Sequence, residues 1–403
     1  MTPRTTLYLI AWLATVGAGV ASSLFSTYLP VMVADIVGST DRADIARVGS
    51  WAGAAFLLGW AFGAMGFGAM ADRVGRKRAL FIGSLTCALG ILGTAFVTSI
   101  PMLVLVRVAT GAGAGSILLL TAVMVSEAWA TGDRAKMVGI LINAFPGGMV
   151  VSGMIASIQP DFRIAYLMGS SMLLLPVAVW FLVPESAWWQ RSGDLHAERH
   201  IGRERLFSTE HRKDLVVGLT LFGTMLIGLW AVFVWAPTWV GTLGDAADAQ
   251  RHRALTNVML GIGSMLGGVL SGPLSNAVGR RKAAVAGYLG CIVLSLATFV
   301  PTQQPNATLF ALIFTLSTFI GINQGVLSGY IPELFPTLIR AAATGLCFNV
   351  GRFITTVTVF FVGVLVPMLG GYDNAIVTFA LAYVVGLLML RGARETRGVM
   401  LPE

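Results

Sequence analysis

Long apolar runs recur along the whole chain, and at about twenty residues each is long enough to cross a bilayer as a helix. Hydrophobic residues make up 56% of the 403 positions and charged residues only 11%, which excludes an ordinary soluble domain. The runs lack the alternation that strands of a transmembrane barrel require. The sequence therefore predicts an all-α integral membrane protein.

We expect about twelve transmembrane helices in two pseudo-symmetric bundles of about six helices each. They are expected near residues 7–33, 48–70, 79–99, 101–129, 136–158, 163–183, 214–243, 254–274, 282–301, 307–331, 341–366 and 374–391. The longest polar stretch divides the chain into an N-terminal half at 1–183, a cytoplasmic linker at 184–213 and a C-terminal half at 214–403.

The loops carry most of the basic residues, and these are unevenly distributed between the two sides of the membrane. About twenty of the 27 Lys and Arg residues fall on the side that holds both termini, and about five fall on the other. The positive-inside rule then predicts that both termini lie on the cytoplasmic side of the inner membrane. Because the basic residues lie in short loops, the net charge of +8 does not indicate a nucleic-acid partner. The segment Met1–Arg4 is too brief for a signal peptide, so the first run is expected to remain as a helix.

A glycine-punctuated basic loop occurs twice, about half the chain apart. GAMADRVGRK at 68–77 follows the second apolar run, and a fainter copy, GPLSNAVGRR at 272–281, follows the eighth. Two other features recur in the same order, each again about half the chain later. They are the pairs Glu127/Arg134 and Glu333/Arg340, and the triplets Pro184-Glu185-Ser186 and Arg394-Glu395-Thr396. This repetition predicts two parallel halves related by an axis along the membrane normal.

The loop at 68–77 resembles the signature of the major facilitator superfamily, through Gly68, Asp72, Arg73, Gly75 and Arg76 with the lysine that follows. The resemblance implies a secondary transporter that works by alternating access, in a frame of twelve helices that covers the whole chain. It implies no cofactor, and it does not identify the cargo.

Three further motifs narrow the resemblance to one branch. PES at 184–186, PELFPTLIR at 332–340 and ETRGVMLP at 395–402 are similar to those of sugar porters, organic-ion transporters and metabolite–proton symporters. CFNVGR at 347–352 is similar to the corresponding segment of bacterial carboxylate and sialate symporters.

The repeated motifs also predict a conformational latch at the cytoplasmic end. Its candidate members are Gly68, Asp72, Arg73, Gly75, Arg76, Glu127, Arg134, Asn276, Gly279, Arg280, Glu333 and Arg340. Pairs of the two glutamates with nearby arginines would hold the halves together when the carrier opens outward, and Asp72 would cap a neighbouring helix. Asn276 replaces Asp72 in the second copy, which predicts a stronger latch on the N-terminal side. The alternative is that these residues only stop translocation and set the topology.

Two arginines, Arg107 and Arg352, lie within predicted helices, whereas the acids fall in loops or near helix ends and the histidines in loops. An arginine at the bilayer centre costs at least about 2.5–3.5 kcal/mol unless it faces a cavity or a partner. In sugar porters, an arginine at the position of Arg107 often faces an acid on the first helix, but residues 17–26 contain none. We therefore expect Arg352, with Arg107, to bind an organic anion near the midplane. The alternative is hydrogen bonding to backbone carbonyls at helix contacts, which a glycine-rich seam beside Arg107 also favours.

Secondary candidates for the substrate site are polar or aromatic residues on the predicted helices 1, 5, 7, 10 and 11. They are Tyr28, Asn143, Trp235, Asn323, Gln324 and Asn349, and each has the alternative of an interhelical packing role. Pro146 is expected to kink the fifth helix.

The remaining residues indicate a transporter rather than an enzyme. The three cysteines fall in apolar runs, no cysteine and histidine spacing suits a metal, and no catalytic constellation or Walker A sequence is present. We expect a monomer whose partners are the bilayer and a small anionic substrate, with or without a coupled proton. A proton would travel with the substrate carboxylate or titrate Glu127; a uniporter and an anion exchanger are alternatives. A carrier of a neutral or cationic metabolite and a non-transporting sensor also remain open.

Overall fold

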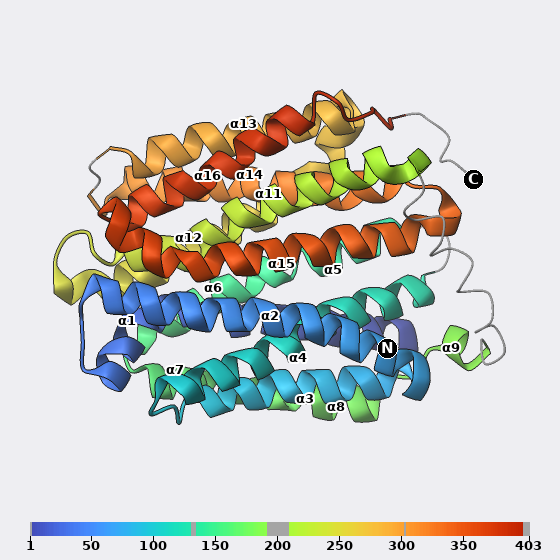
Figure 1. The fold of residues 1–403 in the computed structure, drawn as a ribbon. Helices are drawn as coiled ribbons and strands as arrows, with labels where there is room; N and C mark the ends of the chain where they lie inside the picture. The colour runs from blue at the N-terminus through green and yellow to red at the C-terminus, as the bar shows by residue number, and fades with distance from the viewer. Residues whose placement is uncertain (1, 130–133, 192–208, 302–303, 398–403) are drawn as a thin grey trace.

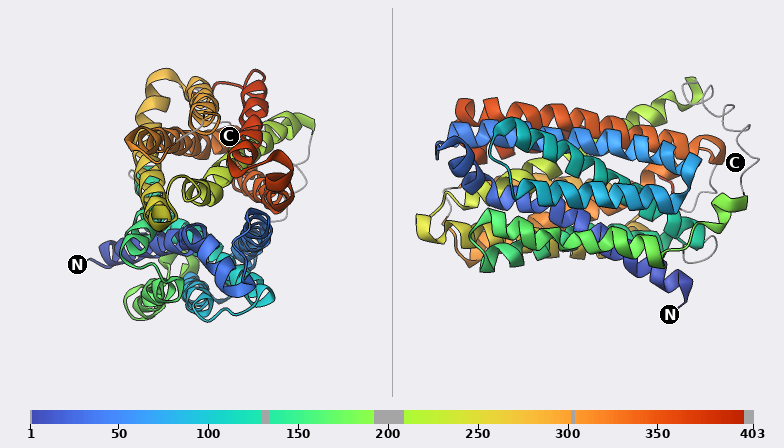
Figure 2. Two further views of the ribbon diagram at one scale, coloured as in Figure 1. Left: turned by 90° about the vertical axis from the view of Figure 1, so that its left-hand side faces the viewer. Right: turned by 90° about the horizontal axis from the view of Figure 1, so that it is seen from below.

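A computed structural model of the chain describes residues 2–129, 134–191, 209–301 and 304–397. All of its regular elements are helical, and the long helices run roughly parallel across the molecule (Figure 1). Helices of the N-terminal part lie together on one side and those of the C-terminal part on the other, as the end-on view in Figure 2 shows.

The N-terminal group contains eight α-helices and one short helix at its end. In order these are α1 (Pro3–Val37), α2 (Arg42–Val74), α3 (Arg76–Thr94), α4 (Ile100–Ala128), α5 (Arg134–Ile142), α6 (Phe145–Ile158), α7 (Phe162–Gly169), α8 (Leu174–Leu182) and the short α9 (Ala187–Arg191). A 3₁₀ turn, Ser170–Leu173, joins α7 to α8, so these two form one span.

Six long helices make up the described part of the C-terminal group. They are α11 (Thr209–Val240), α12 (Ala249–Val278), α13 (Arg280–Phe299), α14 (Ala307–Glu333), α15 (Thr337–Leu369) and α16 (Tyr372–Met389), with a 3₁₀ turn, Ala246–Asp248, before α12.

Eleven stretches among the described residues are long and apolar enough to cross a membrane. The helix α3, which has basic residues in its first turn, is the twelfth long segment. It packs against α2 and α4. The prediction of an all-α protein with about twelve membrane helices is confirmed.

The helix ends differ from the predicted ones because hydropathy marks the apolar part of a helix, whereas polar caps mark its ends. Asp41 accepts a hydrogen bond from the N–H of Ala43 and starts α2 six residues before the predicted position. The helices α11 and α12 also begin earlier than predicted, at Thr209 and Ala249. His211 and His252 lie in their first turns, so the expectation that all histidines lie in loops is wrong for both. His196 and His200 lie outside the described residues.

The structure agrees with two expectations for the apolar runs, the interruption at Pro146 and the burial of the cysteines. The fifth predicted span is broken, because α5 ends at Ile142 and α6 begins at Phe145 with Pro146 in its first turn. The three cysteines, Cys87, Cys291 and Cys347, are buried free thiols.

Close packing of α2 on α4 places Phe56 beside Arg107. A Cβ atom on Gly59 would lie 2.2 Å from the carbonyl oxygen of Val108, and one on Gly111 would lie 2.0 Å from that of Phe56. Only glycine allows the two backbones to approach so closely. The seam brings Phe56 of α2 beside the start of α4.

The described ends of the chain lie at the same end of the molecule as the two glycine-punctuated loops (Figure 1). We call this the motif end, since it holds Gly75 and Gly279, and the opposite one the far end. The far end holds the turns from α1 to α2 and from α15 to α16.

Candidate functional site

The first motif forms a closed network at the motif end of the N-terminal group. Arg76 is only 6% exposed, and its guanidinium pairs with Asp72 at 2.6 Å and with Glu127 at 3.4 Å. The second carboxylate oxygen of Glu127 is buried without a hydrogen-bond partner. Arg73 and Arg134 are exposed. Among the described residues, the ion-pair partner of Glu127 is Arg76 rather than Arg134.

Glu185 caps the start of α3. Its Oε1 accepts hydrogen bonds from the backbone N–H of Arg76 at 2.9 Å and of Lys77 at 3.1 Å. Gly75 has φ +106°, and a Cβ atom there would lie 2.3 Å from Glu185 Oε2. Glycine is therefore required both by the backbone and by the carboxylate. The expectation that Asp72 caps a helix is wrong, because Asp72 pairs with Arg76 and Glu185 provides the cap to α3.

The second motif repeats this arrangement in the C-terminal group. Arg280 pairs with Glu333 at 3.2 Å and donates to the side-chain oxygen of Asn276 at 2.8 Å. Glu395 accepts from the N–H of Arg280 at 2.8 Å, and Gly279 has φ +95° beside it. The internal repeat is thus one of geometry as well as of sequence.

The charge on Glu395 is stabilised by this cap. Partial burial acts to raise the pKa of the carboxyl, but four backbone N–H donors outweigh it and lower the pKa below its ordinary value. Those donors belong to residues 280, 281, 396 and 397.

The ion pairs of the predicted latch join residues of one group in this conformation. Arg340 donates to the carbonyl of Phe335, and Gly68 packs near Leu119. Within the described part of the chain, hydrogen bonds between the two groups lie at the far end or in the middle. Pairing between the groups at the motif end, expected for an outward-open state, stays a prediction.

Asn257 of α12 makes two of the hydrogen bonds that join the two groups toward the far end. Its amide nitrogen donates to the hydroxyl of Thr27 and, at 3.4 Å, to the carbonyl of Ser23, both on α1. Tyr372 at the start of α16 donates to the carbonyl of Arg42 at 3.2 Å. The far end is closed by contacts between α1 and α12 and between α2 and the C-terminal helices.

Arg107 is buried in the middle of the N-terminal group, with 3% of its surface exposed. Its guanidinium carbon lies 4.4 Å from the ring centroid of Phe25 and 4.2 Å from that of Phe56. One nitrogen donates to the carbonyl of Ala21 at 3.0 Å, and Nε has no partner. No described carboxylate lies within ion-pair distance, as the acid-free stretch 17–26 predicted.

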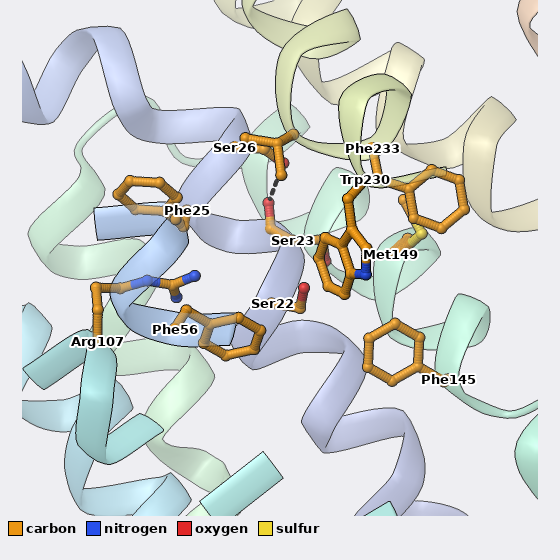
Figure 3. Close-up of a pocket in the computed structure, with 12 residues that line it drawn as sticks. Ser22, Ser23, Phe25, Ser26, Phe56, Arg107, Phe145, Met149, Trp230 and Phe233 are labelled. Atoms are coloured by element: carbon orange, nitrogen blue, oxygen red, sulfur yellow. Dashed lines mark hydrogen bonds between the residues drawn. The ribbon is translucent and has the colours of Figure 1, made fainter. Parts of the chain in front are cut away.

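A small pocket lies beside this arginine, between the two groups (Figure 3). Its volume is about 10 Å³, room for about one water molecule. It is lined by Ser22, Ser23, Phe25, Ser26, Gly53, Phe56, Arg107, Phe145, Met149, Trp230, Phe233 and Val234. Figure 3 shows the Arg107 side chain beside the rings of Phe25 and Phe56 on one side, with Trp230 and Phe233 opposite. The central space is therefore nearly closed in this conformation.

Arg352 lies near the middle of α15, deeper in its helix than predicted because α15 begins at Thr337. Its guanidinium carbon is 5.8 Å from the ring centroid of Trp60 on α2. One nitrogen donates to the side-chain oxygen of Asn349 at 3.5 Å, the upper limit for a hydrogen bond. No described carboxylate pairs with it.

An aromatic cluster connects the two arginines. The ring centroids of Phe56 and Trp60 are 5.7 Å apart, and Trp60 lies 5.9 Å from Trp230 and 5.5 Å from Phe145. Arg107 contacts the Phe56 side of this cluster, and Arg352 contacts the Trp60 side. The two cations thus approach one set of rings from different groups of helices.

A larger cavity of about 580 Å³ opens toward the motif end between α5, α12 and α14. Two of the secondary candidates, Asn143 and Gln324, line it rather than the Arg107 pocket. The amide nitrogen of Asn143 donates to the carbonyl of Met265 at 2.9 Å. The structure therefore places Arg107 at one space and Asn143 and Gln324 at the other, while Arg352 lines neither.

The other secondary candidates line neither cavity. Tyr28 and Trp235 are buried toward the far end, where Tyr28 donates to the carbonyl of Gln159 and Trp235 stacks on Tyr372 with centroids 5.5 Å apart. Asn323 packs against Gly287 of α13, and both of its amide atoms lack a partner. The amide nitrogen of Asn349 donates to the carbonyl of Gly345 at 2.9 Å.

A family model described as Major Facilitator Superfamily matches residues 11–358. The chain belongs to the Major Facilitator Superfamily. It is therefore a multi-pass membrane transporter and not an enzyme, and the resemblance carried by the loop at 68–77 is confirmed.

Two relatives align with this superfamily member over most of both chains. It is 26% identical to the "Probable 4-methylmuconolactone transporter" of Cupriavidus pinatubonensis, over 93% of this chain and 87% of the relative. It is 27% identical to the "Cis,cis-muconate transport protein" of Acinetobacter baylyi, over 86% of this chain and 83% of the relative.

The crystal structure of a D-xylose-proton symporter has the same fold as this transporter. The two superpose with a TM-score of 0.81 at 20% identity, over 99% of this chain and 100% of the other. This likeness concerns the fold and not the cargo.

Several residues that line the centre of the transporter are not among the predicted site residues. Ser22, Ser23 and Ser26 belong to the stretch 17–26, whose predicted significance was only that it contains no acid. The aromatic residues Phe56 and Trp230 carry no prediction at all. Bulky aromatic residues on helices whose neighbours are small would have been a usable signal. Asn257 is a further such residue. It is an amide within an apolar run, a pattern that indicates a polar contact between helices, and it is buried in the structure.

Proposed function

We propose that this transporter carries a small organic carboxylate across the inner membrane by alternating access, and that Arg107 and Arg352 attract the anion. The halves at 1–183 and 214–403 would move as units joined by the linker at 184–213. The motif end would face the cytoplasm with both termini, in accord with the excess of basic residues there.

The observation that carries the proposal is the pair of unbalanced guanidinium groups at one aromatic cluster. Arg107 lies over Phe56 at 4.2 Å and Arg352 over Trp60 at 5.8 Å, and no described carboxylate neutralises either group. A buried arginine without a counter-ion is costly, so an anionic ligand would gain both charge pairing and planar hydrogen bonding there. The rings would pack against an apolar or conjugated part of the ligand.

The names of the relatives support the same class of cargo. Muconate, named for the Acinetobacter baylyi relative, is a dicarboxylate whose two charges suit two arginines. We therefore take cis,cis-muconate as the first substrate to test.

The central pocket of about 10 Å³ is too small for such an anion. The proposed cycle consequently requires the aromatic cluster to separate when the groups of helices rock apart. With the motif end in the cytoplasm, the present conformation is sealed on the outside, where Asn257 joins α12 to α1.

We further propose that a proton accompanies the substrate. Among the described acids, Glu127 is our candidate proton acceptor, because one of its oxygens is buried without a partner while the other meets Arg76 at 3.4 Å. A proton carried on the substrate carboxylate is the competing route, and loss of pH-gradient-driven accumulation in Glu127→Gln with retained counterflow would favour Glu127.

Uptake of labelled cis,cis-muconate into proteoliposomes, with and without a pH gradient, tests the proposal. Arg352→Gln is expected to lower uptake by about two orders of magnitude, because a desolvated charge contact contributes about 2–5 kcal/mol. Arg251→Gln removes an exposed arginine and serves as the matched control. Full uptake by Arg352→Gln would overturn the assignment of that residue.

A thermal-shift screen of carboxylates, sugars and amines tests the class of cargo independently. Stabilisation by sugars or amines alone would replace the carboxylate with a neutral or cationic metabolite. Binding of a carboxylate without flux would indicate a sensor.

A further inference from the structure

The cavity at the motif end is separate from the arginine pocket. Its volume of about 580 Å³ falls in the range of about 300–1,000 Å³ that is usual for small-molecule sites. It lies between α5 on one side and α12 and α14 on the other.

The cavity presents polar groups that the protein itself does not use. Gln324 and Ser328 are four residues apart on α14 and therefore lie on one face of the helix. Neither side chain hydrogen-bonds to a described residue, whereas Asn143, which also lines the cavity, already donates to Met265. These two groups are available to a ligand.

The charge of the lining has one sign. Lys136 of α5 is exposed at the cavity, and none of the described residues that line it is acidic. A concave site lined by one sign of charge concentrates ions of the other sign. The lining therefore favours an anion over a cation.

A break in a helix divides this cavity from the central pocket. Phe145 lines the small pocket, and the next residue, Pro146, lines the large cavity. Phe145 also contacts Trp60, with ring centroids 5.5 Å apart. The wall between the spaces is thus the junction of α5 and α6, at which the helical hydrogen bonding is interrupted.

We propose that the motif-end cavity is a second anion site, in which Lys136, Gln324 and Ser328 hold the substrate carboxylate between the central site and the motif-end solvent. The identity of the anion rests on the proposed function, but the charge preference of the cavity does not. Lys136 supplies the attraction, and the amide and hydroxyl donate hydrogen bonds to the carboxylate oxygens.

A reporter cysteine tests the charge preference without using any substrate. Ser328→Cys is labelled in a non-ionic detergent, free of lipid phosphate, by two methanethiosulfonates, one with an anionic sulfonate and one with a cationic trimethylammonium group. The three native cysteines are buried, which keeps the background low. We expect the ratio of anionic to cationic labelling rates, relative to a free thiol in solution, to exceed one.

Lys136→Gln in the reporter background is expected to lower that ratio by about fivefold. Lys282→Gln removes an exposed lysine that also lies at the motif end but does not line the cavity, so it should leave the ratio unchanged. A ratio of one, a ratio insensitive to Lys136→Gln, or absence of labelling would each overturn the proposal. Gln324→Cys serves as a second reporter if Ser328→Cys does not fold.

Failure here is distinguishable from failure of the proposed function. If muconate uptake depends on Arg352 while the labelling ratio ignores Lys136, only the second site is wrong. If the ratio behaves as expected but no carboxylate is transported, the cavity selects anions and the assigned cargo is wrong.

Discussion

The guanidinium of Arg107 lies against the ring of Phe56, with 4.2 Å between the guanidinium carbon and the ring centroid. Phe56 comes from α2 and Arg107 from α4, and the glycine seam between these helices brings them together. An aromatic face attracts a cation without neutralising it, so the arginine stays available to an anionic ligand.

Phe56→Leu is expected to weaken muconate binding by about five- to thirtyfold, since a desolvated cation–π contact contributes about 1–2 kcal/mol and holds the guanidinium in place. Titration calorimetry on purified protein measures the change. Phe96→Leu, at an exposed phenylalanine, is the control and should bind normally. Equal affinities for the wild type and Phe56→Leu would contradict a positioning role for the ring.

Gly75→Ala should destabilise the protein by about 1–3 kcal/mol, because the residue has φ +106° and its new Cβ would meet the Glu185 carboxylate. The melting temperature in detergent reports the change. Gly66→Ala lies within α2 with open space around it, and should be neutral or stabilising by up to about 1 kcal/mol. If Gly75→Ala melts at or above the melting temperature of Gly66→Ala, the Glu185 cap does not constrain residue 75.

Glu395→Gln should reduce the stability of the protein above pH 4.5 and remove part of its loss in acid. The folded-state pKa of this carboxyl is lower than the ordinary value of 4.5, so its contribution is fully present above pH 4.5. That contribution disappears as the pH falls from 4.5 through the lowered pKa. Melting temperatures of both proteins between about pH 3 and 7 should therefore converge toward the acid limit. Parallel curves would sink the cap assigned to Glu395.

Asn257→Ala should shift the population toward a conformation open at the far end, because it removes the amide that joins α12 to Thr27 and the carbonyl of Ser23. Loss of about 1 kcal/mol changes the equilibrium about fivefold. The labelling rate of Ser26→Cys by a membrane-impermeant reagent reports the opening, since Ser26 is buried when the far end is closed.

Asn374→Ala is the matched control for this shift. Asn374 is exposed, and among the described residues its amide bonds only to the carbonyl of Leu369, in the same group of helices. It should leave the labelling rate unchanged. If both variants label at the wild-type rate, the amide of Asn257 is not part of the outer seal.

The sequence by itself determined the architecture. Lengths of apolar runs fix the number of membrane helices, because every spanning segment must satisfy its own backbone hydrogen bonds. The repeated motif identified the two equivalent corners, at Gly75 and Gly279, and the superfamily. The acid-free stretch at 17–26 correctly indicated that Arg107 has no carboxylate partner on α1.

Only the tertiary structure decided which side chains meet. Glu185 and Glu395 are far in sequence from the helices α3 and α13 that they cap. Gln324 turned out to line the motif-end cavity, whereas its neighbour Asn323 packs inside the C-terminal group. The physical reason is that helices apolar on all faces carry little information about their rotation. Their facing is set by the packing of small residues such as Gly59 and Gly111 against a neighbouring backbone, and these contacts exist only once the helices have assembled.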